Sequence, residues 1–384
     1  MYYDLSGMKT WMSWAAGMCA LLMIPQPPTA MNRTMAKDAR GSQVDAWFSG
    51  LVAAREPGAA VLVLKNGGVA FERGYGVTEL RTLRRIDART SFRLASFTKQ
   101  FTAAAIMLLV RDGKLRYETR LGDIFPDFPA YGQPITIRQL LNHTSGLPDY
   151  EELMPPTDAG APVETIQIRD RDVLELLKRQ AAAKFAPGAQ WAYSNSGYVV
   201  LGLVVEKISG RPFGRFLHDR IFAPLKMDRT LAYERGRNEV PDRAYGHSRE
   251  PDGWRQTDQS PTSATLGDGG VYSSLADLAK WDGALRRHLL LSEAEMRPAL
   301  TPVRVPAGPP VEADGTAAAY GFGWFLNPWE GHDRMWHTGE TRGFRTAIER
   351  FPKDGLTVIV LSNRGDLDAG ALALKIAGVY LERE

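Results

Sequence analysis

Strand-like segments occur at both ends of this chain, and a long middle part with helical patterns separates them. At the N-terminal end, Ala59–Leu64 and Val69–Tyr75 flank Asn66-Gly67-Gly68, the pattern of a β-hairpin across a glycine turn. The strand-like segments of the C-terminal end are 320–326, 334–338, 344–351 and 356–361, with a turn at 352–355. The chain therefore predicts one antiparallel sheet built from its two ends.

The middle part predicts helices and loops. Ser96–Asp112 has apolar residues at helical spacing, and Gly113 is placed to end that helix. Further helices are expected at 44–54, 135–141, 172–180, 198–208, 276–287 and 369–381. Exposed loops are expected at 155–162 and 237–261, which are rich in Pro, Gly and charge. We expect an α+β fold in which a mainly helical lobe, 131–289, is inserted into an α/β lobe made of 44–130 and 290–384.

The N-terminus has the features of an export signal. Lys9 is positively charged, and the apolar stretch Thr10–Ile24 is too short for a membrane span. We therefore expect a signal peptide at 1–30, a flexible polar segment at 31–43 and an exported, periplasmic or secreted domain at 44–384. An uncleaved anchor and a cytoplasmic N-terminal extension are the alternatives. No membrane insertion is expected apart from this signal.

Composition excludes several classes of protein. The chain has 384 residues with a formal net charge of +3 and no long basic run, so nucleic acid is not an expected partner. Its single cysteine, Cys19, cannot form an intramolecular disulfide. The six histidines form no zinc-binding pattern, and neither a phosphate-binding loop nor a G-x-S-x-G motif is present. No metal or organic cofactor is expected, and the oligomeric state stays open.

The first motif that carries chemistry is Ser96-Phe97-Thr98-Lys99. Positions three apart share one face of a helix, so the Ser96 hydroxyl and the Lys99 amine can meet. A partly desolvated lysine can take the serine proton, and a helix start favours a developing oxyanion. The motif alone is weak, because Ser6-Gly7-Met8-Lys9 has the same spacing by chance, and a surface pair is the alternative.

The second motif is Tyr193-Ser194-Asn195. In an extended segment Tyr193 and Asn195 point the same way, so both can face one cleft. A phenol near a lysine can relay a proton, and an asparagine amide can orient a substrate amide. The alternative is a turn before the next helix, with Asn195 as its cap.

The third motif is His337-Thr338-Gly339, at the end of a predicted strand. A strand edge can bind an extended substrate through backbone hydrogen bonds, and Gly339 lets the backbone come close to a ligand. The backbone N–H of Glu340 is a candidate oxyanion donor beside that of Ser96. A strand end with a bulge is the alternative.

In their order along the chain, these motifs resemble those of serine β-lactamases and penicillin-binding proteins, in the class C-like branch with its middle Y-x-N. Supporting segments are Leu140–Leu147, Phe185–Gly188, Gly269–Ser274 and Tyr320–Trp324. The resemblance spans about 45–384. It implies the β-lactamase/DD-peptidase-like fold and a cofactor-free catalytic domain.

The resemblance also implies residue roles. Ser96 would form the acyl-enzyme, while Lys99 and Tyr193 move protons, and which of the two is the first base stays open. Asn195 would orient the substrate amide, and residues 337–339 would form the substrate-binding strand. The family often has lysine where His337 stands, and a neutral histidine is a weaker anchor for a carboxylate. Nearby Arg342 could supply the missing charge, although a solvated loop residue is the favoured interpretation, and His143 is interpreted as a hydrogen-bonded loop histidine.

The expected function is that of a serine hydrolase acting on an amide, peptide or ester, including D-amino-acid peptides of the cell wall. A D-alanyl-D-alanine carboxypeptidase, a β-lactamase and an esterase are the three activities that compete. Two alternatives lie outside the enzyme class: a non-catalytic penicillin-binding or ligand-sensing module, and a structural or assembly protein on the same fold.

Overall fold

The computed structural model describes residues 30–154, 167–308, 310–311, 315 and 317–381. The predicted signal peptide, apart from Ala30, and the whole of the predicted loop at 155–162 lie outside these residues. Helix α1 spans Ala30–Leu51, so the backbone is helical over 31–43, where we predicted a flexible segment. No helix in the described part of the chain combines the length and apolarity that crossing a membrane requires.

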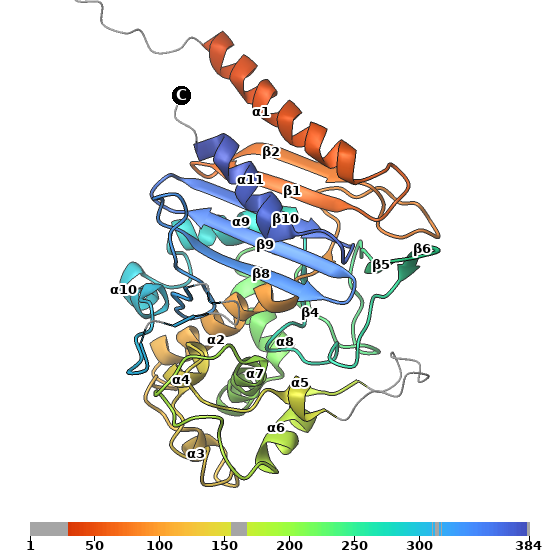
Figure 1. The fold of residues 1–384 in the computed structure, drawn as a ribbon. Helices are drawn as coiled ribbons and strands as arrows, with labels where there is room; N and C mark the ends of the chain where they lie inside the picture. The colour runs from red at the N-terminus through yellow and green to blue at the C-terminus, as the bar shows by residue number, and fades with distance from the viewer. Residues whose placement is uncertain (1–29, 155–166, 309, 312–314, 316, 382–384) are drawn as a thin grey trace, which may run out of the picture. The chain divides into compact units, whose positions relative to one another are not determined.

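A five-stranded antiparallel sheet joins the two ends of the chain, as predicted (Figure 1). Its strands, in spatial order, are β2 (Gly68–Tyr75), β1 (Ala59–Lys65), β10 (Leu356–Ser362), β9 (Phe344–Phe351) and β8 (Met335–Thr341). The junction is the pairing of β1 with β10, in which Ala59 lies opposite Ser362. Asn66 and Gly67 both have positive φ, 53° and 78°, as a tight hairpin turn between β1 and β2 requires.

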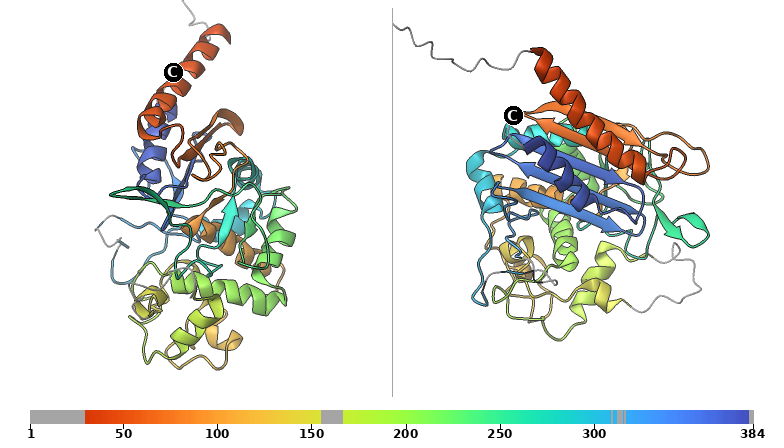
Figure 2. Two further views of the ribbon diagram at one scale, coloured as in Figure 1. Left: turned by 90° about the vertical axis from the view of Figure 1, so that its right-hand side faces the viewer. Right: turned by 45° about the horizontal axis from the view of Figure 1, so that its top comes forward.

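Both faces of the sheet are buried at its central strands, β1, β10 and β9. Val61 and Val63 of β1 belong to a core cluster with Val44 and Phe48 of α1 and with residues of α11 (Ala369–Leu381), which packs on β9 and β10 (Figure 2). Leu62 and Leu64, which alternate with them, join the main core on the other face. On that face α9 (Leu275–Arg286) packs against β1 and β10, although its residues lie within the range predicted for the helical lobe.

The helical part is built around two long helices that pack together, α2 (Lys99–Arg111) and α7 (Asn195–Ser209). Gly210, with φ of 68°, ends α7 in the left-handed conformation that glycine adopts readily. The remaining helices are α3 (Leu121–Ile124), α4 (Ile137–Leu141), α5 (Tyr150–Leu153), α6 (Asp170–Lys178), α8 (Phe213–Leu217) and α10 (Glu293–Met296). Short 3₁₀ or π turns are η1 (Ala95–Thr98), η2 (His218–Phe222) and η3 (Arg297–Leu300).

Two expectations about strands were wrong. Residues 320–326 form no strand; Tyr320 and Phe325 make only isolated bridges, and Gly323 has a φ of 75° that interrupts an extended backbone. The predicted loop 237–261 contains the two-stranded sheet β5 (His247–Glu250) and β6 (Gly253–Gln256). A third sheet has the order β3 (Phe92–Arg93), β7 (Val271–Ser273) and β4 (Leu231–Ala232).

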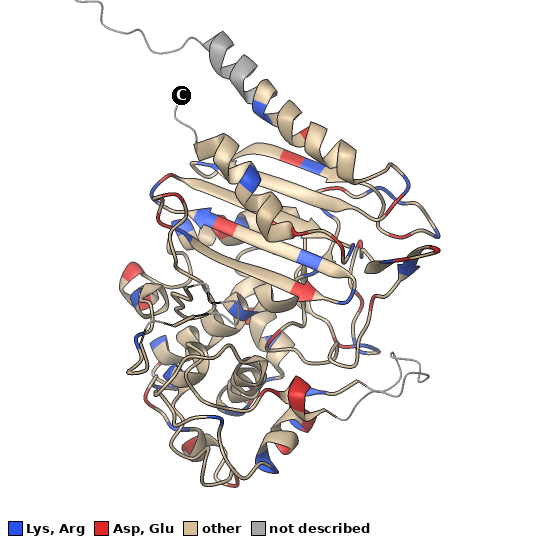
Figure 3. Cartoon of the chain, viewed as in Figure 1, with Lys and Arg blue, Asp and Glu red and all other residues tan. Residues whose placement is uncertain are grey.

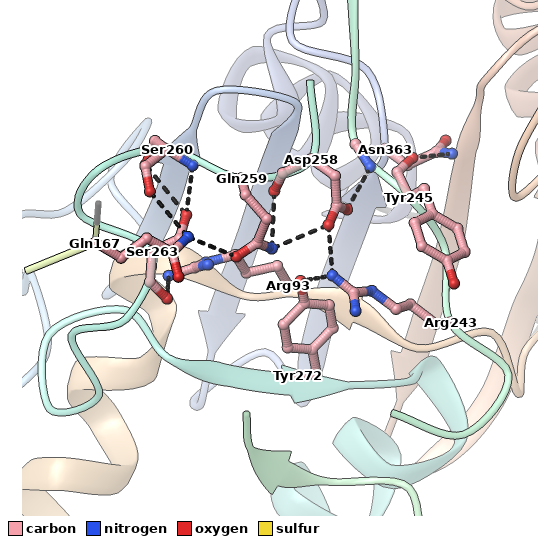
Figure 4. Close-up of polar contacts among 11 residues, drawn as sticks. Arg93, Gln167, Arg243, Tyr245, Asp258, Gln259, Ser260, Ser263, Tyr272 and Asn363 are labelled. Atoms are coloured by element: carbon pink, nitrogen blue, oxygen red, sulfur yellow. Dashed lines mark hydrogen bonds and ion pairs between the residues drawn. The ribbon is translucent and has the colours of Figure 1, made fainter. Parts of the chain in front are cut away.

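A buried polar cluster anchors the segment 243–263 beside β3 (Figure 4). The Asp258 carboxylate pairs with Arg243 and accepts a hydrogen bond of 2.8 Å from the backbone N–H of Gly246. Arg93 of β3 donates to the carbonyl oxygen of Ser263 at 3.1 Å. The cluster therefore ties this segment to the strand that leads into Ser96.

Candidate active site

Ser96 lies on η1, the 3₁₀ turn that leads into α2, so the predicted helix begins as a tighter turn and becomes α-helical at Lys99. Ala95 has a φ of 49°, an uncommon conformation for a residue with a side chain. Lys99 Nζ lies 2.9 Å from Ser96 Oγ, which brings together the two residues of the first motif. Ser96 is partly exposed, whereas Lys99 is fully buried.

The Lys99 amine has two further hydrogen-bond acceptors. They are Asn195 Oδ1 at 2.9 Å and the carbonyl oxygen of Asp268 at 3.1 Å. Burial lowers the pKa of Lys99 to about 8, against the opposing effect of the carboxylates of Asp268, Asp149 and Glu151. A lysine with this pKa has a substantial neutral fraction near neutral pH, so its nitrogen can accept the Ser96 proton.

The second motif lies at the start of α7. Ser194, rather than Asn195, is the N-cap, because its side chain accepts a hydrogen bond from the backbone N–H of Gly197. The backbone N–H of Asn195 donates to Asp149 Oδ2 at 3.0 Å. The ring of Tyr193 lies next to Lys99, with 4.9 Å between its centroid and Nζ. The structure therefore gathers Tyr193 and Asn195 at the amine of the first motif.

His337 of the third motif is buried on β8 and belongs to an aromatic cluster. Its Nδ1 contacts the carbonyl oxygen of Thr338, and its Nε2 lies 3.3 Å from the hydroxyl of Tyr320. Burial, and then the charge of Lys99, lower the pKa of His337 to about 3, while the Thr338 carbonyl acts in the opposite direction. The imidazole is therefore neutral and offers no positive charge to a substrate carboxylate.

Gly339 makes a close backbone approach to the segment that carries Ser96. A Cβ at this position would lie 2.0 Å from the carbonyl oxygen of Leu94. The hydroxyl of Thr346 donates to the same oxygen at 2.8 Å. The glycine therefore lets β8 lie against the segment that carries Ser96. Glu340 is exposed, and its carboxylate lies 3.6 Å from Arg345.

Sequence reasoning missed the acidic residues beside Lys99. Asp149 caps α5, whose first turn carries Glu151 and Glu152, and α5 is an acidic segment in Figure 3. Asp268 is buried, and its carboxylate accepts a hydrogen bond of 2.9 Å from the hydroxyl of Tyr150. In the sequence, the signal for these acidic residues is their place in the chain, next to the family-like segments 140–147 and 269–274. Among the described residues no group of three or more His, Cys, Asp or Glu could hold a metal ion.

This arrangement on this fold defines a class: serine hydrolases that use a lysine beside the serine instead of a histidine. The sequence model of the Beta-lactamase family matches residues 44–380, so the chain belongs to that family. The resemblance of the motifs is thereby confirmed, as is the expected α+β fold. The chain is a serine hydrolase of this family.

Three similar proteins illustrate the range of the family. Penicillin-binding protein 4* of Bacillus subtilis is 34% identical over 79% of this chain and 67% of its own length. A D-aminopeptidase of Cereibacter sphaeroides is 28% identical over 86% of this chain, which spans 61% of that relative. D-amino acid amidase from Ochrobactrum anthropi, solved in complex with L-phenylalanine amide, has a similar structure with a TM-score of 0.74. The match covers 91% of this chain and 98% of the amidase, at 25% sequence identity.

Proposed function

We propose that this protein hydrolyses amides through an acyl-enzyme on Ser96. The neutral Lys99 amine accepts the Ser96 hydroxyl proton as the oxygen attacks the substrate carbonyl carbon. The tetrahedral intermediate collapses, its C–N bond breaks, and the leaving amine takes a proton from the Lys99–Tyr193 pair. Water then attacks the acyl carbon and gives a proton to Lys99, the ester bond to Ser96 Oγ breaks, and Ser96 regains its proton from Lys99. The observation that carries the proposal is the 2.9 Å contact between Ser96 Oγ and the buried Lys99 Nζ.

The other motif residues have supporting roles in this proposal. Asn195 orients the substrate amide and holds Lys99 in place through its side-chain oxygen. The backbone N–H groups of Ser96 and Glu340 stabilise the oxyanion. The close packing of Gly339 on Leu94 supports this role, because it brings the strand that carries Glu340 against the segment that carries Ser96. Thr338 and Gly339 belong to the edge strand β8, along which an extended substrate lies.

The charges around the site favour one class of substrate. β-Lactams and carboxypeptidase substrates carry a carboxylate that the enzyme must bind. The neutral His337 is a poor anchor for such a group. The carboxylates of Asp149, Glu151 and Asp268 surround Lys99 closely enough to affect its pKa. A cationic amino group is stabilised in such a field. We therefore propose amino acid amides and peptides with a free amino group as substrates, and the D-aminopeptidase and D-amino acid amidase among its relatives support this class.

A panel of substrates tests this specificity. We expect D-phenylalanine amide to be hydrolysed with a kcat/KM at least about tenfold above that of its N-acetylated form, since the acetyl group removes the positive charge. Glu151→Gln should reduce this ratio several-fold. Glu152→Gln is the matched control on the same helix, because Glu152 pairs with Lys184 at 2.6 Å. A chromogenic cephalosporin hydrolysed faster than the amide would contradict the proposal, and a preference for nitrophenyl esters would favour an esterase.

We also propose that the protein is exported, with a signal peptide at 1–30 ahead of a catalytic domain at 44–384. The charged and apolar pattern around Lys9 and Thr10–Ile24 supports export. Mass measurement of the protein recovered from the periplasm or medium tests it. A cleaved N-terminus near Ala30 is expected, and full-length protein confined to the cytoplasm would contradict it.

A further inference from the structure

His143 holds the backbone on both sides of Tyr193. The carbonyl oxygen of His143 accepts a hydrogen bond of 3.0 Å from the backbone N–H of Ala192. Its ring nitrogen Nδ1 accepts one of 3.1 Å from the backbone N–H of Ser194. The two donors are the residues directly before and after Tyr193, so one residue fixes the path of the chain through this position.

The imidazole of His143 also fixes the Tyr193 ring. The two ring centroids are 4.3 Å apart with an interplanar angle of 36°, and the ring of Tyr320 contacts His143 from a second side at 4.5 Å. His143 is only 1% exposed, so its ring cannot turn without disturbing this packing. The same Tyr193 ring contacts Lys99 at 4.9 Å.

The hydrogen bond to Ser194 determines the protonation of the imidazole. Because Nδ1 accepts the hydrogen bond from the Ser194 N–H, it carries no hydrogen, and the hydrogen of the neutral ring is on Nε2. Burial and the charges of Lys99 and His337 hold the pKa of His143 well below its usual range, in agreement with a neutral ring. A charged imidazole would place a second N–H against that of Ser194 and break the contact.

We propose that His143 is a positioning residue for catalysis, which holds the Tyr193 phenol at the Lys99 amine through its hydrogen bond to Ser194 and its contact with the ring. The proposal rests on the proposed function, in which Tyr193 and Lys99 move protons together. The contacts of His143 described above are with the backbone around Tyr193 and with the rings of Tyr193 and Tyr320, so it acts on the reaction through Tyr193. Its effect should therefore appear in kcat, since small displacements of catalytic groups slow the chemical step without weakening substrate binding.

Two substitutions separate the hydrogen bond from the backbone conformation. His143 has a φ of 61°, a left-handed conformation that both glycine and asparagine adopt readily. His143→Gly keeps this conformation and removes the acceptor and the ring. His143→Asn keeps it as well, and its Oδ1 can occupy the place of the imidazole Nδ1. Thermal unfolding checks that each variant is folded.

For hydrolysis of D-phenylalanine amide, we expect His143→Gly to lower kcat about 100-fold with KM changed less than about twofold. His143→Asn should recover at least about tenfold of that loss. Equal kcat values for the glycine variant and the wild type would overturn the proposal. So would two variants with equally low activity, because the acceptor would then have no role.

A double-mutant cycle with Tyr193→Phe tests whether His143 acts through Tyr193. In the Tyr193→Phe background, His143→Gly should cost less than about threefold in kcat, because the phenol that it positions is already absent. A full additional 100-fold loss would show that His143 acts independently of Tyr193, which overturns the inference. Failure of the proposed function has another signature: Ser96→Ala would retain activity, whatever happens at His143.

Discussion

Lys99 Nζ and Asn195 Oδ1 lie 2.9 Å apart, although the two residues are 96 positions apart in the chain. The packing of α2 against α7 produces this contact, because Lys99 is the first residue of α2 and Asn195 the first of α7. An ammonium group has three N–H donors. Those of Lys99 are accepted by Asn195 Oδ1, Ser96 Oγ and the Asp268 carbonyl oxygen. The amine that activates the nucleophile is thus held from three segments of the chain.

The first prediction concerns the pH dependence of catalysis. Lys99 must be neutral to accept the Ser96 proton, and burial lowers its pKa to about 8. The kcat/KM for a neutral ester should therefore rise with pH and level off above about 8. Initial rates measured from pH 6 to 10 check this. A profile that is already level at pH 6 is incompatible with Lys99 as the base.

The same lowered pKa predicts how stability depends on pH. In unfolded protein a lysine has its ordinary pKa of 10.5, and in the folded protein Lys99 has one of about 8. Between these values the unfolded state binds more protons, so folding becomes more favourable as pH rises. In Lys99→Met this contribution is missing. The difference in the free energy of unfolding between the wild type and Lys99→Met should therefore shift by about 2 kcal/mol in favour of the wild type from pH 8 to pH 10. A constant difference in denaturant melts would contradict the assignment.

Substitution of Gly339 should separate β8 from the Ser96 segment. In Gly339→Ala the new Cβ meets the Leu94 carbonyl oxygen, a backbone atom that cannot rotate away. We expect kcat/KM to fall about 100-fold, because the strand end and the nucleophile shift apart. Gly50→Ala on α1 is the control, since its Cβ meets nothing within 4 Å, and its activity should equal that of the wild type. Equal activity of both variants would argue against a tight strand contact.

A buried ion pair predicts an effect on stability that is separate from catalysis. Asp282 on α9 accepts hydrogen bonds of 2.7 Å from both Arg350 and Thr357 on the sheet. Asp282→Ala leaves the Arg350 charge buried without its partner, so the free energy of unfolding should fall by about 3–5 kcal/mol. Asp252→Ala, which breaks an exposed pair with Arg255, should have no measurable effect. Chemical denaturation of both variants checks this, and equal losses would contradict it.

Local patterns predicted much of the fold. The hairpin of β1 and β2 follows from Asn66-Gly67, because both residues tolerate positive φ, and strands β8 to β10 follow from their apolar alternation. The contact of Ser96 with Lys99 follows from their spacing at a helix start. Each of these predictions rests on residues that are close together in the chain.

Contacts that depend on the tertiary path were not predictable in this way. The Asp268 acceptor for Lys99 is a main-chain oxygen, which every residue has, so no residue type reveals it. Gly339 was identified as a point of close approach, but only the fold shows that Leu94 is the neighbour. The aromatic residues of 320–326 alternate as in a strand, yet Tyr320 and Phe325 serve to pack around His337.

The most direct test of the account is to map the covalent adduct formed with a fluorophosphonate probe, which reacts with activated serines. Mass spectrometry of the wild-type protein should find one adduct, on the peptide that contains Ser96, and the adduct should disappear in Ser96→Ala together with amide hydrolysis. An adduct on another residue, or a Ser96→Ala variant that still hydrolyses D-phenylalanine amide at the wild-type rate, would contradict Ser96 as the nucleophile.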